Sequence, residues 1–73
     1  MMNKFDFVAQ LGGVYTTEQL DILTTQLAQY TFTKKELCSL KVNQVRELAR
    51  VARVFGWWYM NKAELVCELA TLQ

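Results

Sequence analysis

The sequence has no histidine, no proline and only three glycines, and its two cysteines form no C-x-x-C pair. Without histidine, a general base near neutral pH would have to be a shifted carboxylate or lysine, and no paired acids or nucleophile motif are present. Two isolated cysteines cannot supply the four ligands of a zinc site. We therefore predict that the protein is not an enzyme and that it needs no metal or other cofactor.

The sequence also lacks a long apolar run. A transmembrane helix needs roughly 20 consecutive apolar residues, and no run in the sequence approaches that length. Asp6 interrupts the apolar stretch that an N-terminal signal peptide would require. We expect a cytoplasmic protein without a membrane partner. Cys38 and Cys67 fall on the apolar sides of predicted helices, so we expect both to be reduced core residues.

What the sequence does contain is apolar residues, which make up 52% of its 73 positions against 21% charged ones. This composition predicts one folded domain, residues 1–73, near the lower size limit for a self-sufficient core. A core of this size supplies only about 3–5 kcal/mol, so a homodimer or a protein partner would be a natural further source of stability. The scarcity of glycine and proline favours helices joined by short connections.

Helical spacing and capping signals predict an all-α fold. We expect helices over residues 4–11, 17–30, 34–40, 42–55 and 62–72. The pairs Thr16 with Gln19, Thr33 with Glu36 and Asn61 with Glu64 have capping-box spacing, and Gly56 is expected to end the fourth helix in the left-handed conformation. Residues 1–39 would form an N-terminal helical extension packed on a helix–extended connector–helix unit over residues 40–73.

Charge is distributed unevenly although the net charge is only +1. Residues 1–30 contain one basic and three acidic side chains (net −2), and residues 31–73 contain seven basic and four acidic ones (net +3). On a helical wheel, Arg46, Arg50 and Arg53 form one strip along the border of an apolar face, and Glu47 lies too far round to neutralise all three. The strip is either a solvated surface or a binding site for phosphate oxygens.

The apolar face beside the strip is predicted from the same wheel. Its expected members are Val45, Leu48, Ala49, Val51, Ala52 and Phe55.

Two lysines add to the basic character of this half. Lys62 falls in the first turn of the last helix, where backbone N–H groups and the helix dipole already attract anions. Lys41 precedes the arginine helix. Together with the arginines, these residues provide five cations that could meet on one surface.

Residues 40–69 resemble the helix–extension–helix modules of the SAP family and of the N-terminal domain of transcription termination factor Rho. The match rests on L-K-V from Leu40, V-R-E-L-A-R from Val45, Gly56, and N-K-A-E-L-V from Asn61, with Glu68 and Leu69 closing. In SAP-like modules the N-terminal end of the second helix and the connector contact the nucleic-acid backbone. The resemblance thus implies Lys62 and Asn61 as primary contacts, with Arg46 and Arg50 flanking them, whereas the related LEM modules use a similar frame to hold proteins.

Three consecutive aromatic residues, Trp57, Trp58 and Tyr59, occupy the connector. So short a segment cannot bury all three rings. One tryptophan is expected to fill the gap between the helices, with Tyr59 at the surface. The other tryptophan, near Lys62, is available either to stack on an unpaired base or to anchor a partner protein.

These observations predict a small nucleic-acid-binding module, for DNA or RNA, that contacts phosphate backbone. The candidate binding residues are Lys62, Asn61, Arg46, Arg50, Arg53, Lys41 and Trp58. The alternative is a protein-interaction adaptor that binds no nucleic acid. In it, the acidic N-terminal helices would pair with a second copy or a partner through Phe5, Leu20, Leu23 and Leu27.

Overall fold

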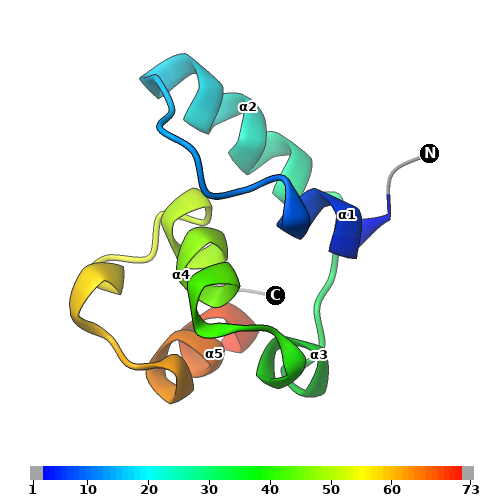
Figure 1. The fold of residues 1–73 in the computed structure, drawn as a ribbon, viewed down its shortest axis with the longest axis vertical. Coiled ribbons are helices and arrows are strands. Elements are labelled where there is room, and N and C mark those ends of the chain that lie inside the picture. The colour runs from blue at the N-terminus through cyan, green and yellow to red at the C-terminus, as the bar shows by residue number, and fades with distance from the viewer. Residues whose placement is uncertain (1–2, 72–73) are drawn as a thin grey trace.

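The structure, a computed structural model, describes residues 3–71 and confirms the all-α prediction (Figure 1). Its elements are α1 (Lys4–Ala9), α2 (Thr17–Leu27), α3 (Lys34–Ser39), α4 (Val42–Val51), the 3-10 helix η1 (Trp57–Tyr59) and α5 (Lys62–Thr71). In Figure 1, α4 lies between α2 on one side and α3 and α5 on the other. Leu72, which we placed in the last helix, lies outside the described residues.

The three predicted capping boxes are all present. Thr16 Oγ1 accepts from Gln19 N at 3.2 Å, and Thr16 N donates to Gln19 Oε1 at 2.9 Å. The same exchange of hydrogen bonds joins Thr33 to Glu36 and Asn61 to Glu64. Because each box satisfies backbone N–H groups that the first helical turn leaves unpaired, the starts of α2, α3 and α5 follow from local sequence.

The core forms around α4, which packs on α1, α2, α5 and η1. Val45, Leu48, Ala49 and Val51 are buried as the wheel predicts. The first three belong to the core cluster, which also contains Leu37 of α3, Phe7 and Val8 of α1, and Leu65, Val66 and Leu69 of α5. Phe55, which we placed on the same face, is instead 83% exposed. The wheel was wrong there because α4 ends before Phe55 is reached.

The end of α4 differs from the prediction. The helix stops at Val51, and Arg53 takes the left-handed conformation with φ of 60°. Val54 N then donates to Ala49 O at 2.9 Å and Arg53 N to Arg50 O at 3.1 Å, the bond pattern of a Schellman motif. This early stop turns Val54 into the core, where it is 7% exposed. Gly56 is left-handed too, with φ of 80°, but it precedes η1 and does not cap α4.

Three further expectations were wrong in detail. Cys38 and Cys67 are exposed, because Leu37 and the pair Val66 and Leu69 take the inward positions of their helices. The first helix ends at Ala9 and does not reach residue 11. The second helix ends at Leu27 and does not reach residue 30. None of its residues is buried, and it contacts the core through half-buried side chains such as Leu23.

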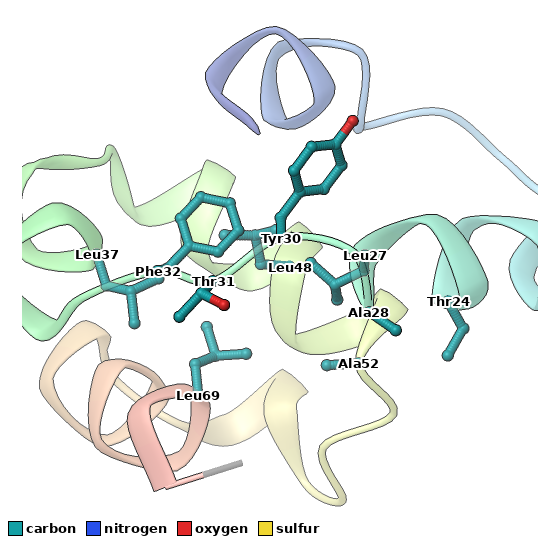
Figure 2. Close-up of a pocket in the computed structure, with 10 residues that line it drawn as sticks. All are labelled: Thr24, Leu27, Ala28, Tyr30, Thr31, Phe32, Leu37, Leu48, Ala52 and Leu69. Atoms are coloured by element: carbon teal, nitrogen blue, oxygen red, sulfur yellow. The ribbon is translucent and has the colours of Figure 1, made fainter. Parts of the chain in front are cut away.

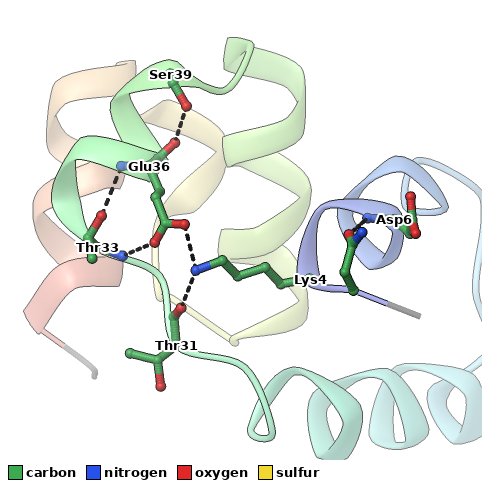
Figure 3. A network of polar contacts seen from close by, with 7 residues as sticks. Lys4, Asp6, Thr31, Thr33, Glu36 and Ser39 are labelled. Atoms are coloured by element: carbon green, nitrogen blue, oxygen red, sulfur yellow. Dashed lines mark hydrogen bonds and ion pairs between the residues drawn. The ribbon is translucent and has the colours of Figure 1, made fainter. Parts of the chain in front are cut away.

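A polar network joins α1 to α3 (Figure 3). Lys4 Nζ lies 2.5 Å from Glu36 Oε2 and donates to Thr31 O at 3.0 Å. The hydrogen bond from Lys4, followed by that from the backbone N–H of Thr33, lowers the pKa of the Glu36 carboxyl below its ordinary value.

Within residues 3–71, no helix combines the length and the apolar character needed to cross a bilayer.

Candidate nucleic-acid interface

Three large rings project from the segment between α4 and α5. Phe55, Trp58 and Tyr59 are 83%, 58% and 66% exposed, and we call these three residues the aromatic surface. Trp58 is at its centre, with its ring centroid 5.9 Å from that of Phe55 and 5.8 Å from that of Tyr59. Both contacts are edge-to-face, which is a favourable arrangement for aromatic pairs. Exposed apolar groups gathered in this way are typical of binding sites.

The backbone of the connector holds the aromatic surface outward. Tyr59 N donates to Gly56 O at 3.1 Å and Met60 N to Trp57 O at 3.4 Å, which closes the single turn of η1. Trp57 is half-buried and packs with Met60 against the core. The prediction that one tryptophan packs inward while the other stays exposed is therefore confirmed, with Trp57 inside and Trp58 outside.

Lys62 and Asn61 both have structural partners. Lys62 Nζ donates to Cys38 O at 2.7 Å, in the last turn of α3. A lysine at a helix C-terminus satisfies an unpaired carbonyl and complements the negative end of the dipole. Asn61 caps α5 by accepting from Glu64 N at 2.9 Å. The first contact joins the start of α5 to the end of α3. Together the two contacts occupy the Lys62 amine and the Asn61 side-chain carbonyl, on residues that we expected to contact phosphate.

The arginine strip is divided between one unpaired residue and two engaged ones. The side chain of Arg46 is exposed and forms no ion pair or hydrogen bond with a described residue. Arg50 Nη2 donates to Gly13 O at 2.8 Å, Nη1 lies 3.4 Å from Glu47 Oε2, and the guanidinium sits 4.9 Å from the ring centroid of Tyr15. Arg53 forms an ion pair with Asp21 of α2.

Lys41 is also unpaired among the described residues. Its side chain is exposed, and its backbone N–H donates to Gln44 Oε1 at 3.0 Å at the start of α4. Of the seven predicted binding residues, Arg46, Lys41 and Trp58 are thus exposed without a polar partner. Glu47 pairs with Arg50, one helical turn away, and not with Arg46 or Arg53, so it neutralises only part of the strip, as the wheel predicts.

A hollow lies elsewhere, between α2, α3, α4 and α5 (Figure 2). It measures about 390 Å³, and its lining side chains are mostly apolar, including Leu27, Phe32 and Leu69. No carboxylate, amine, guanidinium or thiol lines it. Within residues 3–71, cysteine and acidic side chains form no group of three or more that could hold a metal ion.

No family model matches the chain, and neither a curated protein nor a solved structure does.

Proposed function

We propose that this domain binds single-stranded nucleic acid, with unpaired bases stacking on the aromatic surface. The observation that carries the proposal is the exposure of Trp58 at the centre of three clustered rings. Aromatic side chains stack on any base, and each stack contributes about 1–3 kcal/mol. A duplex keeps the faces of its bases covered, so this mode of binding selects unpaired strands.

Cations complement the rings in this proposal. Arg46 and Lys41 are unpaired among the described residues, and Arg53 is two residues from Phe55. One phosphate contact each from Arg46 and Lys41 gives a slope of about −1.4 for the dependence of log affinity on log salt concentration, at roughly −0.7 for each contact with a single strand. The resemblance of residues 40–69 to SAP-like modules supports the same function. Because Lys62, Arg50 and Arg53 have internal partners, stacking contributes more to this binding than phosphate contacts do.

The test is a titration of short single-stranded and duplex oligonucleotides, followed by tryptophan fluorescence and fluorescence anisotropy. We expect binding to the single strand and a loss of about 5- to 150-fold in Trp58→Ala, the range that corresponds to one stacked base. Ile22→Ala is the matched control, since Ile22 on α2 has the same 58% exposure as Trp58. Equal affinity of the wild type and Trp58→Ala, or a preference for duplex, would contradict the proposal.

A protein-interaction adaptor is the second candidate. It is favoured by α2, which buries none of its eleven residues and leaves Ile22 exposed. Exposed apolar side chains on such a helix suit pairing with a second copy or another helix. Sedimentation at several protein concentrations tests this candidate. A mass that rises with concentration in the wild type but not in Ile22→Glu, without nucleic-acid binding, would favour it.

A further inference from the structure

Two arginines of the α4 region are held by residues 13–21, through contacts between residues 37 and 32 positions apart in the chain. The Gly13 carbonyl accepts from Arg50 Nη2 at 2.8 Å, and the Tyr15 ring lies under the same guanidinium at 4.9 Å. Asp21 forms an ion pair with Arg53. We call residues 13–21 the masking segment. Its contacts use a carbonyl, a ring and a carboxylate.

The contacts of the masking segment lie at the surface. The side chains of Arg53 and Asp21 are 59% and 61% exposed, and α2 has no buried residue. Beyond the masking segment, Thr24 of α2 forms a partly buried hydrogen bond by donating from Oγ1 to Val51 O at 2.8 Å. An exposed ion pair contributes little and weakens with salt, so an external anion can replace the carboxylate at modest cost.

The chemistry of these contacts resembles that of nucleic-acid binding. A guanidinium pairs with phosphate oxygens as it does with a carboxylate, and an aromatic ring beneath it is compatible with either partner. Arg53 is also the cation nearest in sequence to Phe55 of the aromatic surface. Phosphates of a strand stacked on that surface would therefore compete with Asp21 for Arg53.

We infer that the masking segment is an intramolecular competitor of nucleic acid, in which Asp21 holds Arg53 and Gly13 with Tyr15 holds Arg50. The free protein thereby presents fewer cations than its sequence contains. The acidic N-terminal half lowers the affinity for polyanions and makes binding depend on displacement of these contacts. The inference rests on the proposed function, because it concerns access to the same interface.

The experiment compares Asp21→Asn with Glu18→Gln by titration of a short fluorescein-labelled oligo(dT) at two salt concentrations. Both variants remove one negative charge from α2, but Glu18 forms no ion pair with a described residue. We expect Asp21→Asn to bind up to about fivefold more tightly than Glu18→Gln. An exposed ion pair shifts an equilibrium constant by no more than about this factor, and its loss makes Arg53 available to phosphate. The salt slope should steepen by about 0.7, which corresponds to one added phosphate contact.

A second comparison assigns the effect to Arg53. In an Arg53→Ala background, Asp21→Asn and Glu18→Gln should change the affinity equally, and thermal melts of all variants confirm that they are folded. If the wild type binds and Asp21→Asn gains no more than Glu18→Gln, the inference is overturned while the proposed function stands. If neither the wild type nor Asp21→Asn binds, both are overturned. Binding by Asp21→Asn alone would support masking in its strongest form.

Discussion

The hydroxyl oxygen of Tyr59 lies over Gly56, 2.5 Å from the position that a Cβ atom on Gly56 would occupy. Gly56 also has φ of 80°, a conformation that side chains with a Cβ atom rarely adopt. The turn after Val54 and the orientation of the Tyr59 ring therefore both depend on the absence of a Cβ atom at Gly56. This relationship links the shape of the connector to its proposed function.

Replacing Gly56 should test that link. We expect Gly56→Ala to lower the free energy of unfolding by about 1–2 kcal/mol through the left-handed conformation, with a further loss from the contact with Tyr59. In a Tyr59→Ala background the second loss should disappear. Urea denaturation of the wild type, the two single variants and the double variant measures both the conformational cost and the cost of the contact with Tyr59. An identical cost in the two backgrounds would show that Tyr59 does not restrict this position.

The sequence predicts where helices begin better than where they end. Each capping box is a local signal, because its two partners are three residues apart, and all three boxes formed. The end of α4 has no such local signal. It depends on Val54 reaching a core that α1, α3 and α5 complete, so Gly56 was a misleading stop and Arg53 took the left-handed position.

That position gives a second prediction. Arg53 has φ of 60° at the end of α4, where glycine is the preferred residue. Arg53→Gly and Arg53→Ala both remove the ion pair with Asp21, so their difference isolates the backbone preference. We expect Arg53→Gly to be more stable than Arg53→Ala by about 1 kcal/mol, measured by urea denaturation. Equal stabilities would contradict the Schellman geometry of this end.

The Lys4–Glu36 contact predicts a dependence of stability on pH. Lys4 lowers the pKa of the Glu36 carboxyl in the folded protein, so folding favours the ionised form. The resulting stabilisation is complete above the ordinary pKa of 4.5 and is lost as the pH falls through the lower folded value. Lys4→Met keeps the alkyl chain but removes the donor. Its stability should fall less on acidification than that of the wild type, as measured by denaturant midpoints across this range. Parallel pH profiles of the two proteins would contradict the prediction.

The exposed thiols give a prediction that reverses our expectation from sequence. Cys38 and Cys67 are both free and exposed, so a disulfide-based thiol reagent should modify both in the folded protein without denaturant. Cys38→Ser and Cys67→Ser should each change the stability by no more than about 0.5 kcal/mol, as surface substitutions usually do. Protection of either thiol until unfolding would place it in the core after all.

The candidate site was predictable in part. The crowding of aromatic residues in a short connector indicated an exposed ring, and Trp58 is one. The partners of the cations were not predictable, because backbone carbonyls such as those of Gly13 and Cys38 have no sequence signature. The contacts that engage Arg50, Arg53 and Lys62 also join positions far apart in the chain, which only the packing of the helices brings together.

Lys62 and Arg46 provide the clearest separation of structural from binding roles. Lys62 Nζ donates to Cys38 O at 2.7 Å, whereas Arg46 has no polar partner among the described residues. Lys62→Met should therefore lower the free energy of unfolding by about 1 kcal/mol, the contribution of a typical hydrogen bond, and change the salt slope of binding little. Arg46→Met should leave stability unchanged and reduce the slope by about 0.7, through loss of one phosphate contact. Urea denaturation and titrations at several salt concentrations measure the two effects on the same samples. If Lys62→Met alone reduced the slope, the amine would have to leave the end of α3 on binding, and the phosphate contact implied by the SAP-like resemblance would be the better assignment.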